Sequence, residues 1–242
     1  MKLSIIIPAY NEEKTILKIL KKIIKVKLTN DLEKEIIIIN DCSKDNTKWL
    51  IEDFINSNPA NNIVLYSQDH NQGKGAAIHK AIELMTGDYV IIQDADLEYD
   101  PNEYNLLLQP IIDEMADVVY GSRYMGGKPR RVLYFWHTFV NKFLTFFSNM
   151  FTNLNITDVH TCYKLFRSDI LKKIILKEKR FAFCPEVTAK IAKIPFIRIY
   201  EVGISYYARK FNEGKKISWK DGVRAMVTVV KYNVFDRKYL KK

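Results

Sequence analysis

Residues 35–47 read EIIIINDCSKDNT, a run of four isoleucines that ends abruptly in polar and acidic residues. An uninterrupted apolar run is typical of a strand covered on both faces, because a strand with one face in water alternates apolar and polar residues. The sequence therefore predicts a buried strand over residues 35–40, with Asp41 at its carboxyl end.

Four other apolar runs in the first 121 residues have the same character, at residues 3–7, 63–67, 89–93 and 118–121. Segments with apolar residues at helical spacing separate these runs, for example residues 16–24 and 76–82. Strands that alternate with helices in this way predict an α/β fold, in which a mostly parallel central sheet is flanked by helices.

The second half of the chain is less regular. We expect an aromatic helix over 132–151, strands over 162–166 and 197–205, and helices near 186–192 and 219–232. No linker rich in Pro, Gly or Ser separates the halves. The sequence therefore predicts one domain, in which a C-terminal extension (residues 122–242) follows the sheet-forming half (residues 1–121).

Composition and cysteine usage exclude several classes of protein. The chain has 242 residues, of which 48% are apolar and 27% charged, as expected for a globular protein with a sizeable core. The three cysteines include no CxxC pair, which predicts reduced thiols in the cytoplasm. The N-terminal apolar run is too short for a signal peptide, and no run reaches the roughly 20 apolar residues of a spanning helix.

Charge is distributed unevenly along the chain. Residues 1–120 carry a net charge of −8, whereas residues 121–242 carry +18. A basic half suits a phosphorylated substrate, an anionic membrane face or nucleic acid. Nucleic acid does not explain the acidic strand ends in the first half, so we do not expect it as a partner.

The strongest motif is QDADLEYDP at residues 93–101. If this segment is extended, Asp94, Asp96 and Glu98 lie on one side, where three carboxylates repel one another unless a hard cation lies between them. The motif predicts Mg²⁺ or Mn²⁺ bridging a diphosphate. A solvated acidic turn is the alternative.

Other motifs refine the expected ligand. Asp41 is suited to bind a ribose or a uracil-type donor, whereas helix capping explains Ser43 and Asp45. The first strand-to-helix turn, IIIPAYNEE, has no glycine, so a dinucleotide fingerprint is absent. Gly73-Lys74-Gly75 lacks the remaining residues of a Walker motif.

Basic residues of the second half are candidate phosphate ligands, because arginine matches phosphate oxygens bidentately. Arg123 directly follows a predicted strand, and Arg209 lies in the string YYARKFNEGKKISWKDG. Asp158 is one of few acidic residues in this half, so it is a candidate to act at the reacting sugar carbon.

The predicted aromatic helix, VLYFWHTFVNKFLTFFSNMF, carries a narrow polar stripe and a wide apolar face. Such a helix either lies within a core or lies in a membrane interface, where preceding arginines are favoured. We expect the interface, with Arg130 and Arg131 beside it.

The motifs together resemble those of one enzyme family. They are IIIPAYNE, NDCSKDNT, DHNQGKGAA, QDADLEYDP, GSR, the Thr157-Asp158 pair with CYKLFR, FCPEVTAKIAK and YEVGISYYARKFNEGKKISWKDG. In this order they are similar to glycosyltransferase family 2, specifically the dolichyl- or polyprenyl-phosphate hexosyltransferases related to dolichol-phosphate mannose synthase. The resemblance covers nearly the whole chain.

The resemblance implies a GT-A fold, a nucleotide-sugar donor, a divalent metal and chemistry at the cytoplasmic face of a membrane. Residues 1–121 would bind the nucleotide sugar and the metal, and residues 122–242 the acceptor and the membrane. The roles that it implies are donor binding by Pro8, Tyr10, Glu12, Ile39, Asp41, Asp94, Ala95, Arg209 and Lys215, metal binding by Asp94, Asp96 and Glu98, contact with the acceptor phosphate by Arg123, Arg130 and Arg131, and catalysis by Asp96, Asp158 and Arg123.

The expected reaction is inverting transfer of mannose or glucose from GDP-mannose or UDP-glucose to a polyprenyl or dolichyl phosphate. The alternatives are transfer to a hydroxyl of a glycan or lipid, and a module that binds a nucleotide sugar without turnover. The sequence departs from the family at two positions, because similar sequences often carry acidic residues where this chain has His160 and Cys184. These differences bear on which donor or acceptor the protein prefers. The C-terminal membrane helices of some relatives are missing, so we expect peripheral attachment to an anionic membrane surface.

Overall fold

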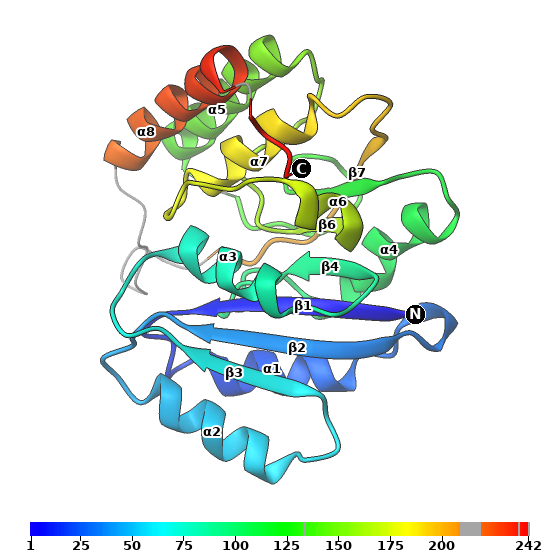
Figure 1. Ribbon diagram of the computed structural model, residues 1–242, viewed down its shortest axis with the longest axis vertical. Helices are drawn as coiled ribbons and strands as arrows, with labels where there is room; N and C mark the ends of the chain where they lie inside the picture. Colours follow the sequence, from blue (N-terminus) through cyan, green and yellow to red (C-terminus); the bar gives the residue numbers. More distant parts are fainter. Residues whose placement is uncertain (133, 209–218, 237, 242) are drawn as a thin grey trace.

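The computed structural model describes residues 1–132, 134–208, 219–236 and 238–241 (Figure 1). All five strands predicted in the first half are present, with ends within two residues of those expected. The elements of this half are β1 (Lys2–Ala9), α1 (Ile16–Lys25), β2 (Glu33–Asn40), α2 (Thr47–Ser57), β3 (Ile63–Ser67), α3 (Lys74–Leu84), β4 (Tyr89–Ile92), α4 (Tyr104–Ile112) and β5 (Val118–Ser122).

The second half supplies two further strands and four helices among the described residues. The predicted aromatic helix begins at Phe135, and the helix predicted near 219–232 ends in a short π-helical segment, Lys231–Phe235. The elements are α5 (Phe135–Thr152), β6 (Lys164–Arg167), α6 (Ser168–Lys173), α7 (Phe183–Ile191), β7 (Ile199–Gly203) and α8 (Trp219–Val230).

The seven strands form one mixed sheet in the order β3-β2-β1-β4-β6-β5-β7. Every neighbouring pair is parallel except those of β6, which runs antiparallel to both β4 and β5. The prediction of a mostly parallel sheet is confirmed. Residues from both halves of the chain therefore share a single sheet, since β6 lies between β4 and β5.

Two apolar layers cover the faces of this sheet, as the uninterrupted apolar runs indicated. Along β1, Ile5 and Ile7 pack into the layer formed with α1, α2 and α4, whereas Ile6 packs into the opposite layer with α3 and α7. Both layers are buried because successive side chains of a strand point to opposite faces.

Helices α5 and α8 pack against each other at one end of the molecule (Figure 1). Helix α5 turns polar side chains inward, since Thr145, Ser148 and Thr152 are buried. Its aromatic side chains are largely exposed, and Trp136 retains 71% of its accessible surface. No described helix is long and apolar enough to cross a membrane.

The parallel strands β1, β2, β4 and β5 end at the same edge of the sheet (Figure 1). The residues after them belong to the motifs PAYNE, NDCSKD, QDADLE and GSR. Ligands of open α/β sheets bind beyond the carboxyl ends of the strands, so we expect a ligand site at this edge.

Candidate active site

The ends of β1 and β2 lie side by side at this edge. Pro8 is in register with Ile39, and the backbone N–H of Asp41 donates to the carbonyl of Ala9 at 2.8 Å. Ile39 is fully buried, so its contact with a donor stays a prediction. Pro8, Ile39 and Asp41, all predicted to bind the donor, are therefore neighbours.

The Asp41 carboxylate organises the loop between β3 and α3. It accepts hydrogen bonds from the backbone N–H groups of Gln72 and Gly73, both at 2.8 Å, and from the side chains of Gln68 and Asn71, both at 3.0 Å. Burial raises the pKa of Asp41, although the backbone donors counteract part of this effect. In this arrangement Asp41 positions the loop, and its direct contact with a donor stays a prediction.

The turn after β1 carries Tyr10 and Glu12, which were predicted to bind the donor. The backbone carbonyl of Glu12 accepts from the N–H groups of Thr15 and Ile16, so this residue forms the turn that leads into α1. Its own N–H donates to the Thr47 hydroxyl at 2.8 Å. Glu12 thus connects the turn after β1 with the start of α2.

The acidic segment after β4 is a turn and not an extended strand. Leu97 has a φ of 65°, which reverses the chain between Asp96 and Glu98. The N–H of Glu98 donates to Asp96 at 3.1 Å, and the carboxylate of Glu98 accepts from the Tyr206 hydroxyl at 2.9 Å. The expectation that Asp94, Asp96 and Glu98 share one side of an extended segment is therefore wrong.

The carboxylates at this turn are the candidate metal ligands. Among the described residues, no three His, Cys, Asp or Glu side chains come together in a group that could hold a metal. Mg²⁺ is usually held by one or two carboxylates together with substrate phosphates, so a complete protein cage is not required. Asp94, although it pairs with Lys74, and Asp96 are suited to such a site, and Glu98 accepts from Tyr206; metal binding by these three residues stays a prediction.

Lys74 is the site residue that the motif search missed. Its ammonium group forms an ion pair with Asp94 and lies 2.8 Å from the Cys162 sulfur. Burial by itself lowers the pKa of Lys74, but the charge of Asp94 outweighs it and holds the pKa well above its ordinary value. The sequence signal is a lysine between two glycines at the start of a helix, in a pattern that differs from the Walker motif.

The glycines around Lys74 allow α3 to begin close to the backbone of another loop. Gly73 has a φ of 96°, and a Cβ at Gly75 would lie 2.2 Å from the carbonyl oxygen of Glu178. A larger side chain at either position would push the start of α3 away from residues 178–180. Lys74 is therefore directed toward Asp94 by a tightly packed helix start.

Arg123 and Asp158 form a buried bidentate ion pair. The guanidinium donates to the two carboxylate oxygens at 2.7 and 2.8 Å, and the backbone N–H of Arg123 donates at 3.1 Å. Arg123 is 7% exposed and Asp158 is fully buried. Burial raises the pKa of Asp158, but the Arg123 charge and hydrogen bonds bring the net value below the ordinary one.

The partners of this pair show how the predicted phosphate ligands are arranged. Arg130 donates to the backbone carbonyl of Arg123 at 2.9 Å, and Arg131 donates to that of Ala208 at 2.7 Å. The guanidinium of Arg123 also lies 5.1 Å from the centre of the Tyr206 ring. The structure thus brings Arg123, Arg130 and Asp158 together beside Tyr206. Arg209 and Lys215 lie outside the described residues.

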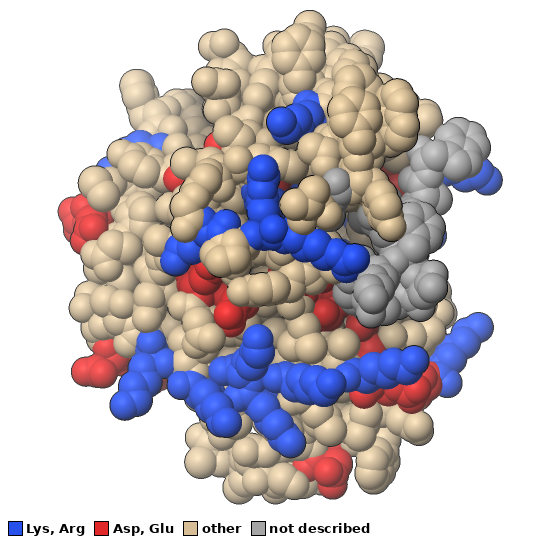
Figure 2. Space-filling model, turned by 180° about the vertical axis from the view of Figure 1, so that it is seen from behind, with Lys and Arg blue, Asp and Glu red and all other residues tan. Residues whose placement is uncertain are grey.

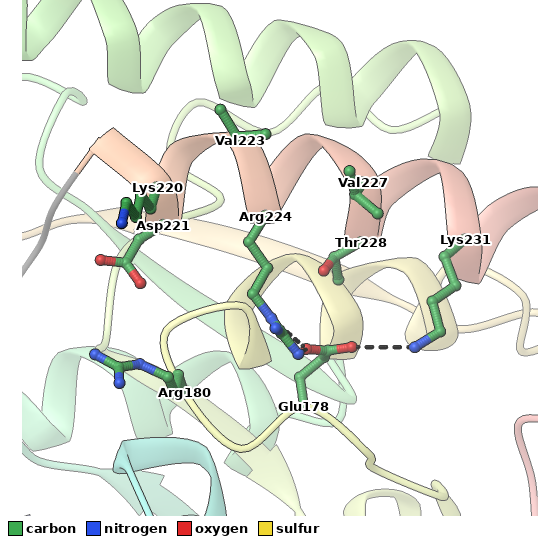
Figure 3. Close-up of a pocket in the computed structure, with 9 residues that line it drawn as sticks. All are labelled: Glu178, Arg180, Lys220, Asp221, Val223, Arg224, Val227, Thr228 and Lys231. Carbon is green, nitrogen blue, oxygen red and sulfur yellow. Dashed lines mark hydrogen bonds and ion pairs between the residues drawn. The ribbon is translucent and has the colours of Figure 1, made fainter.

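A separate pocket of about 600 Å³ lies beneath α8 (Figure 3). Glu178, which is 4% exposed, forms its charged centre and accepts from Arg224 at 2.8 Å, Tyr232 at 2.9 Å and Lys231 at 3.3 Å. These bonds attach α8 and the following segment to the loop that also contacts α3. Of the residues predicted to bind donor or metal, none that the structure describes lines this pocket.

Replacing Glu178 with glutamine is expected to lower the free energy of unfolding by about 1.5 to 3 kcal/mol, the range for hydrogen bonds to charged groups. Burial raises the pKa of Glu178, but its bonds to Arg224, Tyr232 and Lys231 give a net lowering. The stabilisation is therefore complete above the ordinary pKa of 4.5 and is lost as the pH falls through the lowered value.

Thermal unfolding between pH 3 and pH 7 measures this effect. Glu83→Gln is the matched control, because Glu83 is 65% exposed and forms an ion pair with Lys80 across one turn of α3. The control should change stability by less than about 0.5 kcal/mol. Equal losses in the two variants would contradict an anchoring role for Glu178.

The mixed seven-stranded sheet, with an acidic pair at the end of β4, defines the class: this is a GT-A fold glycosyltransferase. Residues 4–175 match glycosyl transferase family 2, and the chain belongs to that family. The predicted fold, enzyme class and family are confirmed.

Curated relatives carry names from the predicted group. The chain is 28% identical over 249 residues to dolichyl-phosphate beta-glucosyltransferase ALG5D of Trichomonas vaginalis, covering 97% of this chain and 73% of the relative. It is 31% identical over 218 residues to dolichyl-phosphate beta-glucosyltransferase of Dictyostelium discoideum, covering 84% and 66%. These names support the resemblance to the dolichyl-phosphate hexosyltransferases.

Solved structures share the fold at lower identity. Glucosyl-3-phosphoglycerate synthase from Mycobacterium tuberculosis, in complex with Mn²⁺, UDP and phosphoglyceric acid, matches with a TM-score of 0.73 and 16% identity, covering 97% of this chain and 79% of the other. The same enzyme with Mg²⁺ and UDP matches with a TM-score of 0.71 and 14% identity, covering 96% and 79%. At this identity the similarity concerns the fold.

Proposed function

We propose that the protein transfers a hexose, mannose or glucose, from GDP-mannose or UDP-glucose to a polyprenyl or dolichyl phosphate, with inversion at the sugar and dependence on Mg²⁺ or Mn²⁺. The observation that supports this proposal is that two clusters lie at one edge of the sheet. The Asp94–Asp96 turn, which Lys74 contacts, follows β4, and Arg123, which pairs with Asp158, follows β5. The names of the curated relatives support a dolichyl-phosphate acceptor.

The donor side of the proposed site consists of two carboxylates and one ammonium group. Asp94 and Asp96 would hold the divalent ion, which supplies Lewis-acid stabilisation of the departing nucleoside diphosphate. Lys74 remains charged because its pKa is raised by Asp94, so it can neutralise phosphate oxygens beside that carboxylate. Asp41 contributes by holding the loop that leads to Lys74.

The acceptor side requires positioning more than proton transfer. A phosphate oxygen is already ionised near neutral pH, so it can attack the anomeric carbon without a strong general base. Arg123 and Arg130 would orient such an anion, and the ion pair with Asp158 fixes the direction of the Arg123 guanidinium. Asp158 is then a positioning residue.

Product analysis tests the proposed reaction directly. The full chain is incubated with a panel of nucleotide sugars, polyprenyl phosphate and Mn²⁺, and the lipid fraction is analysed by mass spectrometry. We expect a hexosyl polyprenyl phosphate from one nucleotide sugar. A panel that yields no glycosylated lipid, while a glycan hydroxyl is modified, would favour the alternative acceptor.

We further propose that α5 and α8 attach the enzyme peripherally to the anionic, cytoplasmic face of a membrane. Figure 2 shows a largely uncharged cap at the end of the molecule where these helices lie, bordered by Lys and Arg. Helix α5 exposes Trp136 and Phe146, and α8 exposes Val227 at 59%. An apolar outer face over a polar inner face is unusual for a helix that meets only water.

Charge around the cap favours an anionic leaflet over a neutral partner. Arg130 and Arg131 precede α5, and each basic residue near such a surface adds roughly 1 kcal/mol. Aromatic side chains would supply the apolar part of the binding energy.

Sedimentation with vesicles tests this attachment. We expect the protein to sediment with vesicles that contain anionic phospholipid, and Trp136→Ala to weaken binding roughly tenfold because one large apolar side chain no longer enters the interface. Trp49→Ala is the matched control, since Trp49 is 61% exposed on α2, at the other end of the molecule (Figure 1). Equal binding of both variants would place α5 outside the interface.

A further inference from the structure

Two cysteines, distant in sequence, meet beside the candidate active site. The side chains of Cys162 and Cys184 lie next to each other. Cys162 precedes β6, and Cys184 is the second residue of α7, where its sulfur lies 3.8 Å from the carbonyl oxygen of Thr161. The proposed reaction uses neither sulfur.

The pair is connected to the donor side of the site through Lys74. The Lys74 ammonium contacts the Cys162 sulfur at 2.8 Å and is also paired with Asp94. Any change of bonding at Cys162 therefore alters the surroundings of a cation placed to meet donor phosphates. Cys42 is not part of the cluster, because its sulfur faces the carbonyl of Asp69 at 3.6 Å.

The surroundings activate the dithiol. A helix N-terminus and nearby lysine side chains stabilise the thiolate of a cysteine, which is its reactive form. The hydrogen bond from Cys162 is the largest influence on Cys184 and lowers the pKa of that thiol to about 6, against the effect of burial. Cys184 is the second residue of α7, so it is the sulfur expected to react first, and Cys162 is the neighbouring thiol that completes the disulfide.

We propose that Cys162 and Cys184 form a redox-active dithiol that closes to a disulfide under mild oxidation and weakens donor binding through Lys74. A peroxide supplies the two-electron oxidant. Its distal oxygen oxidises the Cys184 thiolate to a sulfenic acid, and the Cys162 thiol then displaces water as the sulfur–sulfur bond forms. In total, two thiols and one hydrogen peroxide yield one disulfide and two waters.

The consequence for the site follows from the contact of Lys74. In the reduced protein, Cys162 offers this cation the sulfur of a thiol. In the disulfide, that sulfur is bonded to Cys184 and is drawn toward it. The contact between Lys74 and the sulfur then changes, so the position of Lys74 relative to the donor phosphates changes. This consequence rests on the proposed function, whereas the disulfide itself does not.

Thiol counting tests the dithiol without any activity measurement. The folded full-length protein is treated with low concentrations of hydrogen peroxide, alkylated and analysed by intact and peptide mass spectrometry. We expect alkylatable thiols to fall from three to one, with a cross-link between the Cys162 and Cys184 peptides and Cys42 still free. Loss of Cys42 first, or no cross-link, overturns the proposal, and Cys184→Ser should prevent the cross-link.

Calorimetry with UDP or GDP and Mn²⁺ tests the control of donor binding. We expect roughly tenfold weaker nucleotide affinity after oxidation, the loss of about one charged hydrogen bond, and recovery with dithiothreitol. A disulfide that leaves the affinity unchanged overturns the control through Lys74. Reduced protein that binds no nucleotide counts against the proposed function, while the thiol count still decides whether the dithiol exists.

Discussion

Replacing Asp96 with alanine is expected to abolish metal-dependent nucleotide binding and to lower turnover about a thousandfold or more, with the fold retained. Asp96 is the second carboxylate of the turn after β4, and it accepts a hydrogen bond from the N–H of Glu98. Loss of one hard oxygen ligand from a shared cation site removes several kcal/mol of stabilisation from the departing diphosphate. Calorimetry with nucleotide and Mn²⁺, followed by turnover measurements, provides the check.

Glu98→Gln is the control for this experiment. Glutamine keeps an oxygen that can accept from the Tyr206 hydroxyl, but it removes the negative charge. If two carboxylates hold the ion, the variant should bind nucleotide nearly as well as the unmodified protein. A loss as large as that of Asp96→Ala would restore Glu98 as a ligand, and unchanged affinity in Asp96→Ala itself would refute the metal assignment.

Replacing Arg123 with alanine is expected to raise the acceptor concentration needed for half-maximal rate by roughly tenfold to a hundredfold, as for a charged hydrogen bond worth about 1.5 to 3 kcal/mol. The variant should also lose about 3 to 5 kcal/mol of stability, because the carboxylate of Asp158 stays buried without its partner. Arg123→Lys keeps the charge but not the two-pronged geometry, so it should recover stability more than acceptor affinity.

Asp158→Asn separates the two acceptor chemistries. With a phosphate acceptor, the variant should lose activity through a misplaced Arg123, and the pH dependence of its rate should match that of the unmodified enzyme. With a hydroxyl acceptor, it should lose the hundredfold to ten-thousandfold of general-base catalysis together with the corresponding limb of the pH profile. Since the pKa of Asp158 is lowered, that limb would lie below the ordinary range of a carboxyl group. Product on a sugar hydroxyl, with polyprenyl phosphate untouched, would refute the phosphate acceptor.

The fold could be predicted because its signals are local. Each strand of the first half is a continuous apolar run, and residues 35–40 alone indicate a strand covered on both faces. The direction of β6 could not be predicted, because a short run such as 162–166 looks the same whether it pairs parallel or antiparallel. The sheet order depends on contacts between distant residues, which single runs do not encode.

The candidate site could be predicted only in part, because its contacts also join residues that are distant in the sequence. Motifs at strand ends identified Asp94, Asp96 and Arg123, but spacing along the chain assumed an extended backbone that Leu97 interrupts. The pairing of Arg123 with Asp158 joins residues 35 positions apart. Tertiary packing makes that pair, so no sequence pattern shows it.

Charge counted along the sequence also differs from charge on the surface. The first 120 residues carry a net −8, yet α1 within them presents an exposed face of lysines. The acidic side chains of that half include Asp41 and Asp96, which are buried at the sheet edge. The division into an acidic and a basic half therefore does not describe the faces that meet a membrane or a substrate.

The position of β6 has a consequence for how the chain is synthesised. When β5 has left the ribosome, β4 and β5 are both complete, but the strand that joins them is still more than forty residues away. Until it arrives, each presents an open edge of unpaired backbone groups, which is a site for aggregation. A fragment that stops after β5 would retain those edges permanently. Insertion of β6 is thus the step that joins β5 to the strands already formed, and β7 then adds to the outer edge of β5.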